Sequence, residues 1–227
     1  IAALAMRNIS GKKILTVHGI YSEQIGMLHG TLSLKLSNKF EKNAFSWADA
    51  VTAGSKDAFD YYSKLGSKVF FVPNAIDIKS LPSGFETKYE KQIIFAGRLS
   101  KEKGILTILE TAKNLENIHF LGYQPKEKTI PLIRGSSLLI QPSFAEGISA
   151  TLLESMACKT PIIATHIGGN KELLIHNKTG ILIEPGNSNE LLKEIMRMLN
   201  NQNLRDEIAR SAYDAVQKYD WSNVGQL

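Results

Sequence analysis

Cysteine is almost absent from this chain. Its 227 residues include one Cys and five dispersed His. A single Cys cannot form an intrachain disulfide framework, and with so few His it also excludes a Cys-rich zinc module. This scarcity of thiols fits a protein of a reducing compartment.

Long hydrophobic runs are missing as well. The uncharged apolar stretches are only a handful of residues long, so none of them predicts a bilayer span. The opening stretch at 1–6 (IAALAM) has no basic leader and is too short for a signal sequence. We therefore expect that a longer protein has been cut here. Together with the lone Cys, the lack of a leader predicts a cytoplasmic location.

Neither sign of charge forms a block. Lys and Arg number 27 against 22 Asp and Glu, which gives a net charge of +5, and the basic residues are spread along the chain. No aromatic-interleaved basic stretch or recognition motif appears, so nucleic acid is not an expected partner. The mild positive charge suits anionic ligands or peripheral contact with an anionic membrane surface. The 43% apolar and 22% charged content excludes global disorder.

Short apolar runs alternate with helical patterns along the chain. Most runs are apolar at consecutive positions, which is typical of parallel strands covered on both faces. Strands are predicted at 14–17, 50–53, 69–72, 93–96, 118–121, 138–141, 161–165 and 180–183. Helices are predicted at 33–47, 55–65, 103–115, 126–134, 149–158, 170–176, 188–200 and 204–219. The alternation predicts an α/β fold with doubly wound, Rossmann-like parallel sheets.

One change in composition divides the chain. Residues 77–92 are polar, contain Pro and Gly, and show little apolar periodicity, so we interpret them as a linker or surface loop. The first unit would hold about three βα elements, and the second would hold five strands with their helices. We accordingly place a first domain at 1–80 and a second at 81–227.

Two basic side chains follow the strand predicted at 93–96. Gly97 and Arg98 come directly after it, and Lys103 opens the next predicted helix. Ligands of open α/β sheets bind at the carboxyl ends of the strands, where a helix N-terminus already favours an anion. An Arg fork and a Lys at this point could clamp a diphosphate. The spacing is neither a Walker loop nor GxGxxG, and a solvated loop with ordinary surface charges explains it equally well.

Two glutamates follow the strand predicted at 138–141. Glu146 lies in the turn beside Gly147, which lets the backbone pass close to a ligand, and Glu154 lies in the next helix. The N–H groups of residues 149–151 would open that helix toward the same point. Two alternatives stay open. Thr151 and Glu154 have the spacing of a capping box, and Glu146 could be a loop residue that favours a helix N-terminus.

Two further positions need an interpretation. His18 follows the strand predicted at 14–17 and precedes a glycine. It could be a polar catalytic group at a cleft or a structural side chain bonded to backbone. Cys158 is expected to be a small buried residue of a helix.

Taken in order, these segments resemble the retaining glycosyltransferases of family 4, which adopt the GT-B fold. The E-x7-E pair Glu146 and Glu154, together with the GRLxxxKG stretch at 97–104, is quite specific to such enzymes. The matching segments are TVHG (16–19), ADAVTAGSK (48–56), VPNAID (72–77), FAGRLSKEKG (95–104), IHFLGY (118–123), QPSFAEGISATLLESMACKTPIIAT (141–165), GGNKEL (168–173), GILIEPGN (180–187) and DWSNV (220–224).

The resemblance implies a two-domain enzyme that uses a nucleotide-diphosphate sugar as donor and needs no metal or other cofactor. Seven positions match the family's donor-binding residues: Gly97, Arg98, Lys103, Ile148, Ser149, Ala150 and Glu154. Within this set, Arg98 and Lys103 match the residues that hold the diphosphate, and Glu154 matches the glutamate that accepts the ribose hydroxyls.

The resemblance also implies a pair of catalytic residues. Glu146 matches the glutamate near the donor sugar, and His18 matches the histidine that the acceptor-side domain points into the cleft. The implied reaction moves the sugar to a glycan or a lipid-linked acceptor with retention of configuration at the anomeric carbon.

The chain departs from the family pattern at both domains. The early strands and the Gly-rich loop of the N-terminal domain have no counterpart before Ile1. The family also has a further strand and helix before the FLGY segment, whereas this chain runs straight on from 115 to 118. Two other functions therefore stay open: a fragment that binds the donor nucleotide without turnover, and a GT-B epimerase or hydrolase of nucleotide sugars.

Overall fold

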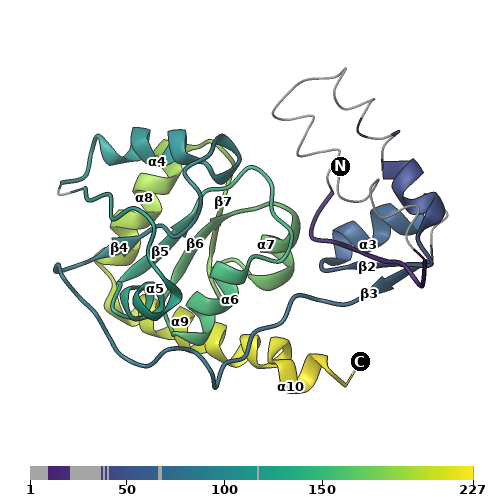
Figure 1. Ribbon diagram of the computed structural model, residues 1–227. Coiled ribbons are helices and arrows are strands. Elements are labelled where there is room, and N and C mark those ends of the chain that lie inside the picture. Colours follow the sequence, from purple (N-terminus) through teal and green to yellow (C-terminus); the bar gives the residue numbers. More distant parts are fainter. Residues whose placement is uncertain are drawn as a thin grey trace.

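Two parallel sheets organise the molecule. The computed structural model describes residues 10–20, 37, 39, 41–65, 68–116 and 118–226. These residues form two lobes, each built on its own sheet (Figure 1). The smaller sheet has the order β1-β2-β3, the larger has the order β4-β5-β6-β7, and all neighbouring strands are parallel. The α/β architecture with parallel sheets is thus confirmed.

The elements follow the predicted alternation closely. The strands are β1 (Ile14–Val17), β2 (Ala50–Ala53), β3 (Val69–Phe71), β4 (Ile93–Ile94), β5 (Leu138–Gln141), β6 (Ile162–Thr165) and β7 (Ile181–Ile183). The helices are α3 (Lys56–Ser63), η2 (Lys101–Lys103), α4 (Ile105–Ala112), α5 (Lys126–Arg134), α6 (Ala150–Ala157), α7 (Gly168–Leu173), α8 (Ser188–Leu199), α9 (Gln202–Val216), η3 (Gln217–Tyr219) and α10 (Trp221–Val224). None of the helices in the described ranges is both long enough and apolar enough to cross a membrane.

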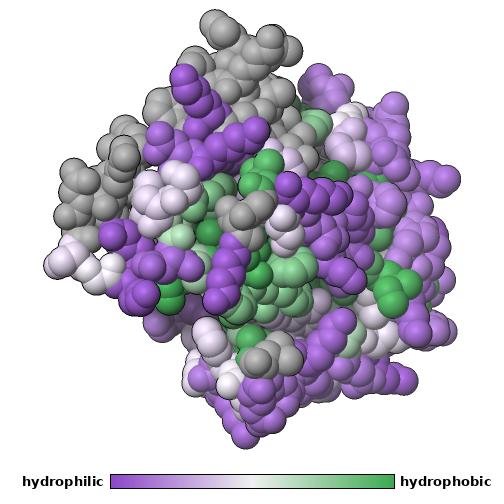
Figure 2. Space-filling model, turned by 90° about the vertical axis from the view of Figure 1, so that its right-hand side faces the viewer, coloured by the Kyte–Doolittle hydropathy of each residue, from purple (hydrophilic) through white to green (hydrophobic). Residues whose placement is uncertain are grey.

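The first lobe packs its helices on one small apolar cluster. Phe45 and Tyr62 lie there with their ring centroids 4.7 Å apart, next to Val51 and Ala53 of β2. Within the helix predicted at 33–47, residues 37, 39 and 41–47 are helical, whereas 33–36, 38 and 40 lie outside the described residues, as does the stretch at 1–6. The face on this side of the molecule is mostly hydrophilic, with apolar side chains near its centre (Figure 2).

The second lobe is covered by helices on both faces of its sheet. Every residue of β5 and β6 is buried. Along β5, Leu138 and Ile140 belong to the core under α8, while Leu139 belongs to the core shared with α6 and α9. Successive strand residues point to opposite faces, so two cores on one sheet require the consecutive apolar positions seen in the sequence.

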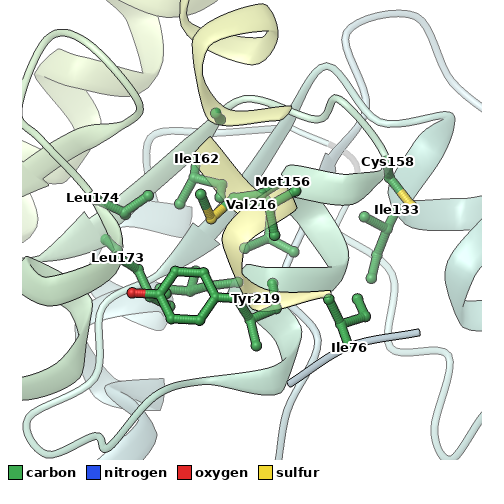
Figure 3. Close-up of a cluster of buried hydrophobic side chains, with 14 of the residues drawn as sticks. Ile76, Ile133, Met156, Cys158, Ile162, Leu173, Leu174, Val216 and Tyr219 are labelled. Atoms are coloured by element: carbon green, nitrogen blue, oxygen red, sulfur yellow. The ribbon is translucent and has the colours of Figure 1, made fainter. Parts of the chain in front are cut away.

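The segment that leaves the first sheet is anchored in the core of the second lobe. Ile76 lies in the same buried cluster as Tyr219 and Leu173 (Figure 3), and its backbone N–H donates to Tyr219 O at 2.9 Å. The carboxylate of Asp220 accepts hydrogen bonds from the side chain and N–H of Ser222 and from the N–H of Ile78. These bonds, first of all that from the Ser222 side chain, hold the pKa of Asp220 below its usual value.

One predicted strand is wrong. Residues 118–121 form no strand, and Ile118, Phe120 and Leu121 are exposed. Four strands rather than five therefore make up the sheet of this lobe in the described part of the chain. The physical reason is that apolar composition alone does not form a strand. β4 lies at an edge of the four-stranded sheet, and residues 118–121 do not pair with it.

Candidate functional site

The carboxylate of Glu146 is held from three directions. It lies in the loop between β5 and α6, and its side chain is only 9% exposed. Its Oε1 accepts hydrogen bonds from Lys103 Nζ at 2.6 Å, Ser143 Oγ at 2.8 Å and Gln141 Nε2 at 3.0 Å. Lys103 supplies a positive charge against the negative one. The structure thus brings together Glu146 and Lys103, two residues that the sequence singled out separately.

Two residues that sequence analysis missed support this carboxylate. Gln141 and Ser143 are buried, and each is fixed in turn. Ser149 Oγ donates to Gln141 Oε1 at 3.1 Å, and Thr165 Oγ1 donates to the carbonyl of Ser143 at 2.6 Å. A polar Gln at the end of an otherwise apolar, fully buried strand is the signal that could have found the first of them, since a buried amide requires partners.

The backbone around Glu146 passes so close to its neighbours that side chains are excluded. A Cβ on Gly147 would lie 1.9 Å from the carbonyl oxygen of His18 in the first lobe. A Cβ on Gly169 would lie 2.2 Å from the carbonyl oxygen of Gly147. Glycine is the one residue that permits both approaches. The loop is therefore packed against the first lobe on one side and against α7 on the other.

Helix α6 opens directly after this loop. Ser149 precedes the first helical residue with an extended backbone, and its side chain does not cap the helix. The positive end of the helix dipole is therefore not offset by a hydrogen bond from the first N–H groups to the Ser149 hydroxyl. Ile148, just before it, accepts a hydrogen bond from Asn74 Nδ2 at 2.7 Å. Ala150, the first helical residue, is exposed. Together these positions form an N-terminus of the kind that attracts anions.

The capping-box alternative for this helix is wrong. Thr151 is not the cap residue, and its hydroxyl donates to the carbonyl of Ala96 at 3.4 Å. Glu154 forms an ion pair with Lys126 at 3.2 Å and is 19% exposed at its side chain. The hydrogen bond from Thr151 to Ala96 places the start of α6 beside the residue that directly precedes Gly97 and Arg98.

Gly97 and Arg98 lie in an exposed loop after β4. The guanidinium of Arg98 is paired with Glu102 at 2.6 Å, and its side chain is 77% exposed. The structure thus shows Arg98 with its charge directed to solvent and to Glu102, whereas Glu146 is paired with Lys103 and Glu154 with Lys126.

A cavity of about 550 Å³ lies between the two lobes next to Glu146. Residues from both lobes line it: Gly19, Ile20, Ser55, Asp57, Ala58, Asp60, Tyr61 and Lys64 from the first, and Phe144, Ala145, Glu146, Ile167, Gly168 and Lys171 from the second. His18 lies just after the carboxyl end of β1; its neighbour Gly19 lines the cavity, whereas His18 itself does not. Among the described residues, no group of three or more His, Cys, Asp or Glu side chains is arranged to hold a metal ion.

Comparison with known proteins finds similarity in the second lobe. Residues 109–215 match the family model described as Glycosyl transferases group 1, a match that covers slightly less than half of the chain. An uncharacterized glycosyltransferase of Methanocaldococcus jannaschii is 26% identical over 250 aligned positions, which cover 97% of this chain and 68% of that protein. A phosphatidyl-myo-inositol mannosyltransferase of Mycobacterium leprae is 27% identical, over 72% of this chain and 45% of that protein.

Solved structures agree on the fold. The sucrose-phosphate synthase of Thermosynechococcus elongatus superposes with a TM-score of 0.82 at 18% identity, over 99% of this chain and 68% of that one. HepE of Anabaena in complex with UDP-glucose gives a TM-score of 0.81 at 21% identity, over 99% and 73%. The chain thus has the parallel α/β architecture of GT-B glycosyltransferases. It spans between 43% and 68% of the length of four curated relatives.

Proposed function

We propose that the second lobe binds a nucleotide-diphosphate sugar and that the protein transfers the sugar to an acceptor in the cavity between the lobes. One observation carries this proposal. A nearly buried carboxylate, Glu146, lies beside the N-terminus of α6, is paired with Lys103, and lines an open cavity to which both lobes contribute residues. The match of residues 109–215 to the Glycosyl transferases group 1 model supports the same function.

The donor diphosphate would bind at the N-terminus of α6. The backbone from Ile148 to Ala150 would offer N–H groups and the positive end of the helix dipole. Lys103 and Arg98 would add positive charge, and fixed positive charge stabilises a departing nucleoside diphosphate. Gly97 would let the backbone approach the phosphates. Glu154, beside α5, would accept the ribose hydroxyls, for which an ionised carboxylate has the required acceptor oxygens.

Glu146 would act at the donor sugar. Its Oε1 is occupied by three donors, so its orientation is set before substrate binds. A fixed negative charge at this place can stabilise the positive charge that develops at an anomeric carbon as the nucleotide leaves. His18 would approach from the first lobe on the acceptor side. We propose that the configuration at the anomeric carbon is retained and that no metal takes part.

The acceptor is proposed to be a glycan or a lipid-linked sugar. The mycobacterial relative is named for transfer to phosphatidyl-myo-inositol, a lipid, and HepE has been solved in complex with UDP-glucose. A net charge of +5 suits peripheral contact with an anionic membrane from the cytoplasm. Two domains, 1–80 and 81–227, would divide the work, with the acceptor bound mainly by the first and the donor by the second.

A transfer assay tests this function. The chain is incubated with radiolabelled UDP-, GDP- and ADP-sugars and with glycan or lipid-extract acceptors, with and without EDTA, and the anomeric configuration of the product is read by NMR. Glu146→Gln keeps the size of the side chain but removes its charge, and Glu207→Gln, on the exposed face of α9, is the matched control.

We expect transfer that EDTA does not affect, loss of about 100-fold or more with Glu146→Gln as for other groups that stabilise transition-state charge, and no change with Glu207→Gln. Release of free sugar without any acceptor would favour the hydrolase alternative. Binding of nucleotide without transfer would favour the binding-only alternative. Full transfer by Glu146→Gln would contradict the proposal.

A further inference from the structure

Helix α7 is attached to the Glu146 loop at its first turn. The N–H of Gly169 donates to the carbonyl of Glu146 at 3.2 Å. A Cβ on Gly168 would lie 2.4 Å from the same carbonyl oxygen, so the backbones of the helix and the loop are in close contact here. Displacement of α7 would therefore displace the loop that carries the carboxylate. In the ribbon drawing, α7 is on the side of the second lobe that faces α3 (Figure 1).

The last turn of α7 holds the first lobe through one carboxylate. Glu172 Oε2 accepts the N–H of Lys56 at 2.8 Å, and Glu172 Oε1 accepts the N–H of Asp57 at 3.0 Å. These two residues begin α3, whose first N–H groups have no partner within the helix. Ser55 Oγ accepts the next N–H along, that of Ala58, at 3.3 Å. Glu172 thus completes the cap of a helix that belongs to the other lobe.

The charges make this contact stronger than its neighbours. A carboxylate at a helix N-terminus gains from the helix dipole, and hydrogen bonds to an ionised acceptor are about twice as strong as neutral ones. The adjacent ion pair between Lys171 and Asp57, at 3.4 Å, joins the same elements, but both side chains are more than a third exposed, so it contributes little. The interlobe bond from Asn74 to the Ile148 carbonyl is neutral.

We propose that Glu172 is a positioning residue that clasps α3 when the lobes close and, through α7, places the Glu146 loop for reaction. Ser55, Asp57 and Ala58 of the clasped segment line the same cavity as Glu146, so the clasp also fixes the distance across that cavity. The inference rests on the proposed function, because it describes how the carboxylate is presented to the sugar. It adds that closure of the lobes and placement of the carboxylate are one event.

The backbone donors offer an unusually clean test. Lys56 is the first residue of α3, a position that favours proline, and Ser55 before it already has the extended backbone (φ −133°, ψ 154°) that proline requires. Lys56→Pro removes one N–H donor to Glu172 without breaking the helix. Lys56→Ala removes the same exposed side chain but keeps the donor, and so serves as its matched control.

The lobes are labelled at Lys12→Cys and Lys193→Cys, both at exposed positions, since the native Cys158 is buried. Single-molecule FRET then gives the ratio of closed to open molecules. We expect this ratio to fall about tenfold with Glu172→Gln and about fivefold with Lys56→Pro, and to stay unchanged with Lys56→Ala and Glu207→Gln. In Glu172→Gln and Lys56→Pro we expect kcat to fall, while the dissociation constant of the donor nucleotide stays within about twofold of the wild-type value.

FRET distributions of Glu172→Gln and Lys56→Pro that equal that of the wild type would overturn the clasp. If the variants show the expected changes in FRET but the wild type transfers no sugar, the proposed function is contradicted. The clasp then remains as a contact between the lobes. Opening of the lobes without any fall in kcat would refute the link to Glu146.

Discussion

The ion pair between Lys103 and Glu146 should contribute far more to stability than its exposed counterpart. Both Lys103–Glu146 and Arg98–Glu102 have an N–O distance of 2.6 Å, but the Lys103 side chain is 22% and the Arg98 side chain 77% exposed. Hydrogen bonds to charged groups contribute about 1.5–3 kcal/mol when sheltered, whereas exposed pairs contribute about 0–1 kcal/mol. We therefore predict a larger coupling energy for Lys103–Glu146 than for Arg98–Glu102.

The perturbation is a double-mutant cycle. Lys103→Met, Glu146→Gln and the double variant are unfolded in urea, and the same cycle is run with Arg98→Met and Glu102→Gln. We expect a coupling energy of about 1.5–3 kcal/mol for the first cycle. With a slope of about 2 kcal/mol per molar urea, Lys103→Met should lower the midpoint by about 1 M.

Glu146 keeps its hydrogen bonds from Ser143 and Gln141 in Lys103→Met. The loss of unfolding free energy should therefore stay below that for a buried charge left without any partner, which is about 3–5 kcal/mol. A coupling energy no larger than that of the Arg98 cycle would refute the reasoning, because it would mean that the enclosure of Glu146 does not strengthen its ion pair.

Three further outcomes follow from single contacts. Gly147→Ala places a Cβ 1.9 Å from the His18 carbonyl, so transfer should fall at least about tenfold; activity equal to wild type would contradict the close packing of the lobes. Burial raises the pKa of the Cys158 thiol, so its reaction with iodoacetamide at pH 8 should be much slower in native than in urea-unfolded protein, and equal rates would contradict that burial. The hydrogen bonds that lower the pKa of Asp220 stabilise the folded protein above the unfolded value of about 3.9, and this stabilisation is lost as the pH falls through the lower pKa of the folded state. Asp220→Asn should therefore be less stable than the wild type at pH 7, and the difference should vanish over that fall in pH. A pH-independent difference would contradict this.

Four elements have the predicted bounds: β1, β2, β5 and α5. Burial on both faces explains the consecutive apolar residues of β5, whereas β2 is buried on one face only and no residue of β1 is buried. The prediction at 118–121 failed for a different reason. Apolar composition predicts a strand only where a neighbouring strand supplies hydrogen-bond partners, and which strands are neighbours is a property of the whole sheet.

The site was predictable in its residue types but not in its connections. Position at strand ends indicated Glu146 and Lys103, yet their direct pairing depends on the path of two loops 43 residues apart. The role of Glu172 could not be predicted, since its partners are backbone N–H groups 115 and 116 residues away, which leave no mark in the residue type at those positions.

The central claim is that the second lobe binds a nucleoside diphosphate. The most direct test measures this binding through the thermal unfolding of the chain in the presence of UDP, GDP or ADP. A nucleotide at about 100 times its dissociation constant should stabilise the protein by about 2.7 kcal/mol. We predict that one base gives this shift, that Arg98→Ala and Glu154→Gln abolish it, and that Glu207→Gln leaves it intact. No shift with any nucleoside diphosphate, or a shift that survives in both site variants, would contradict the assignment of the donor site.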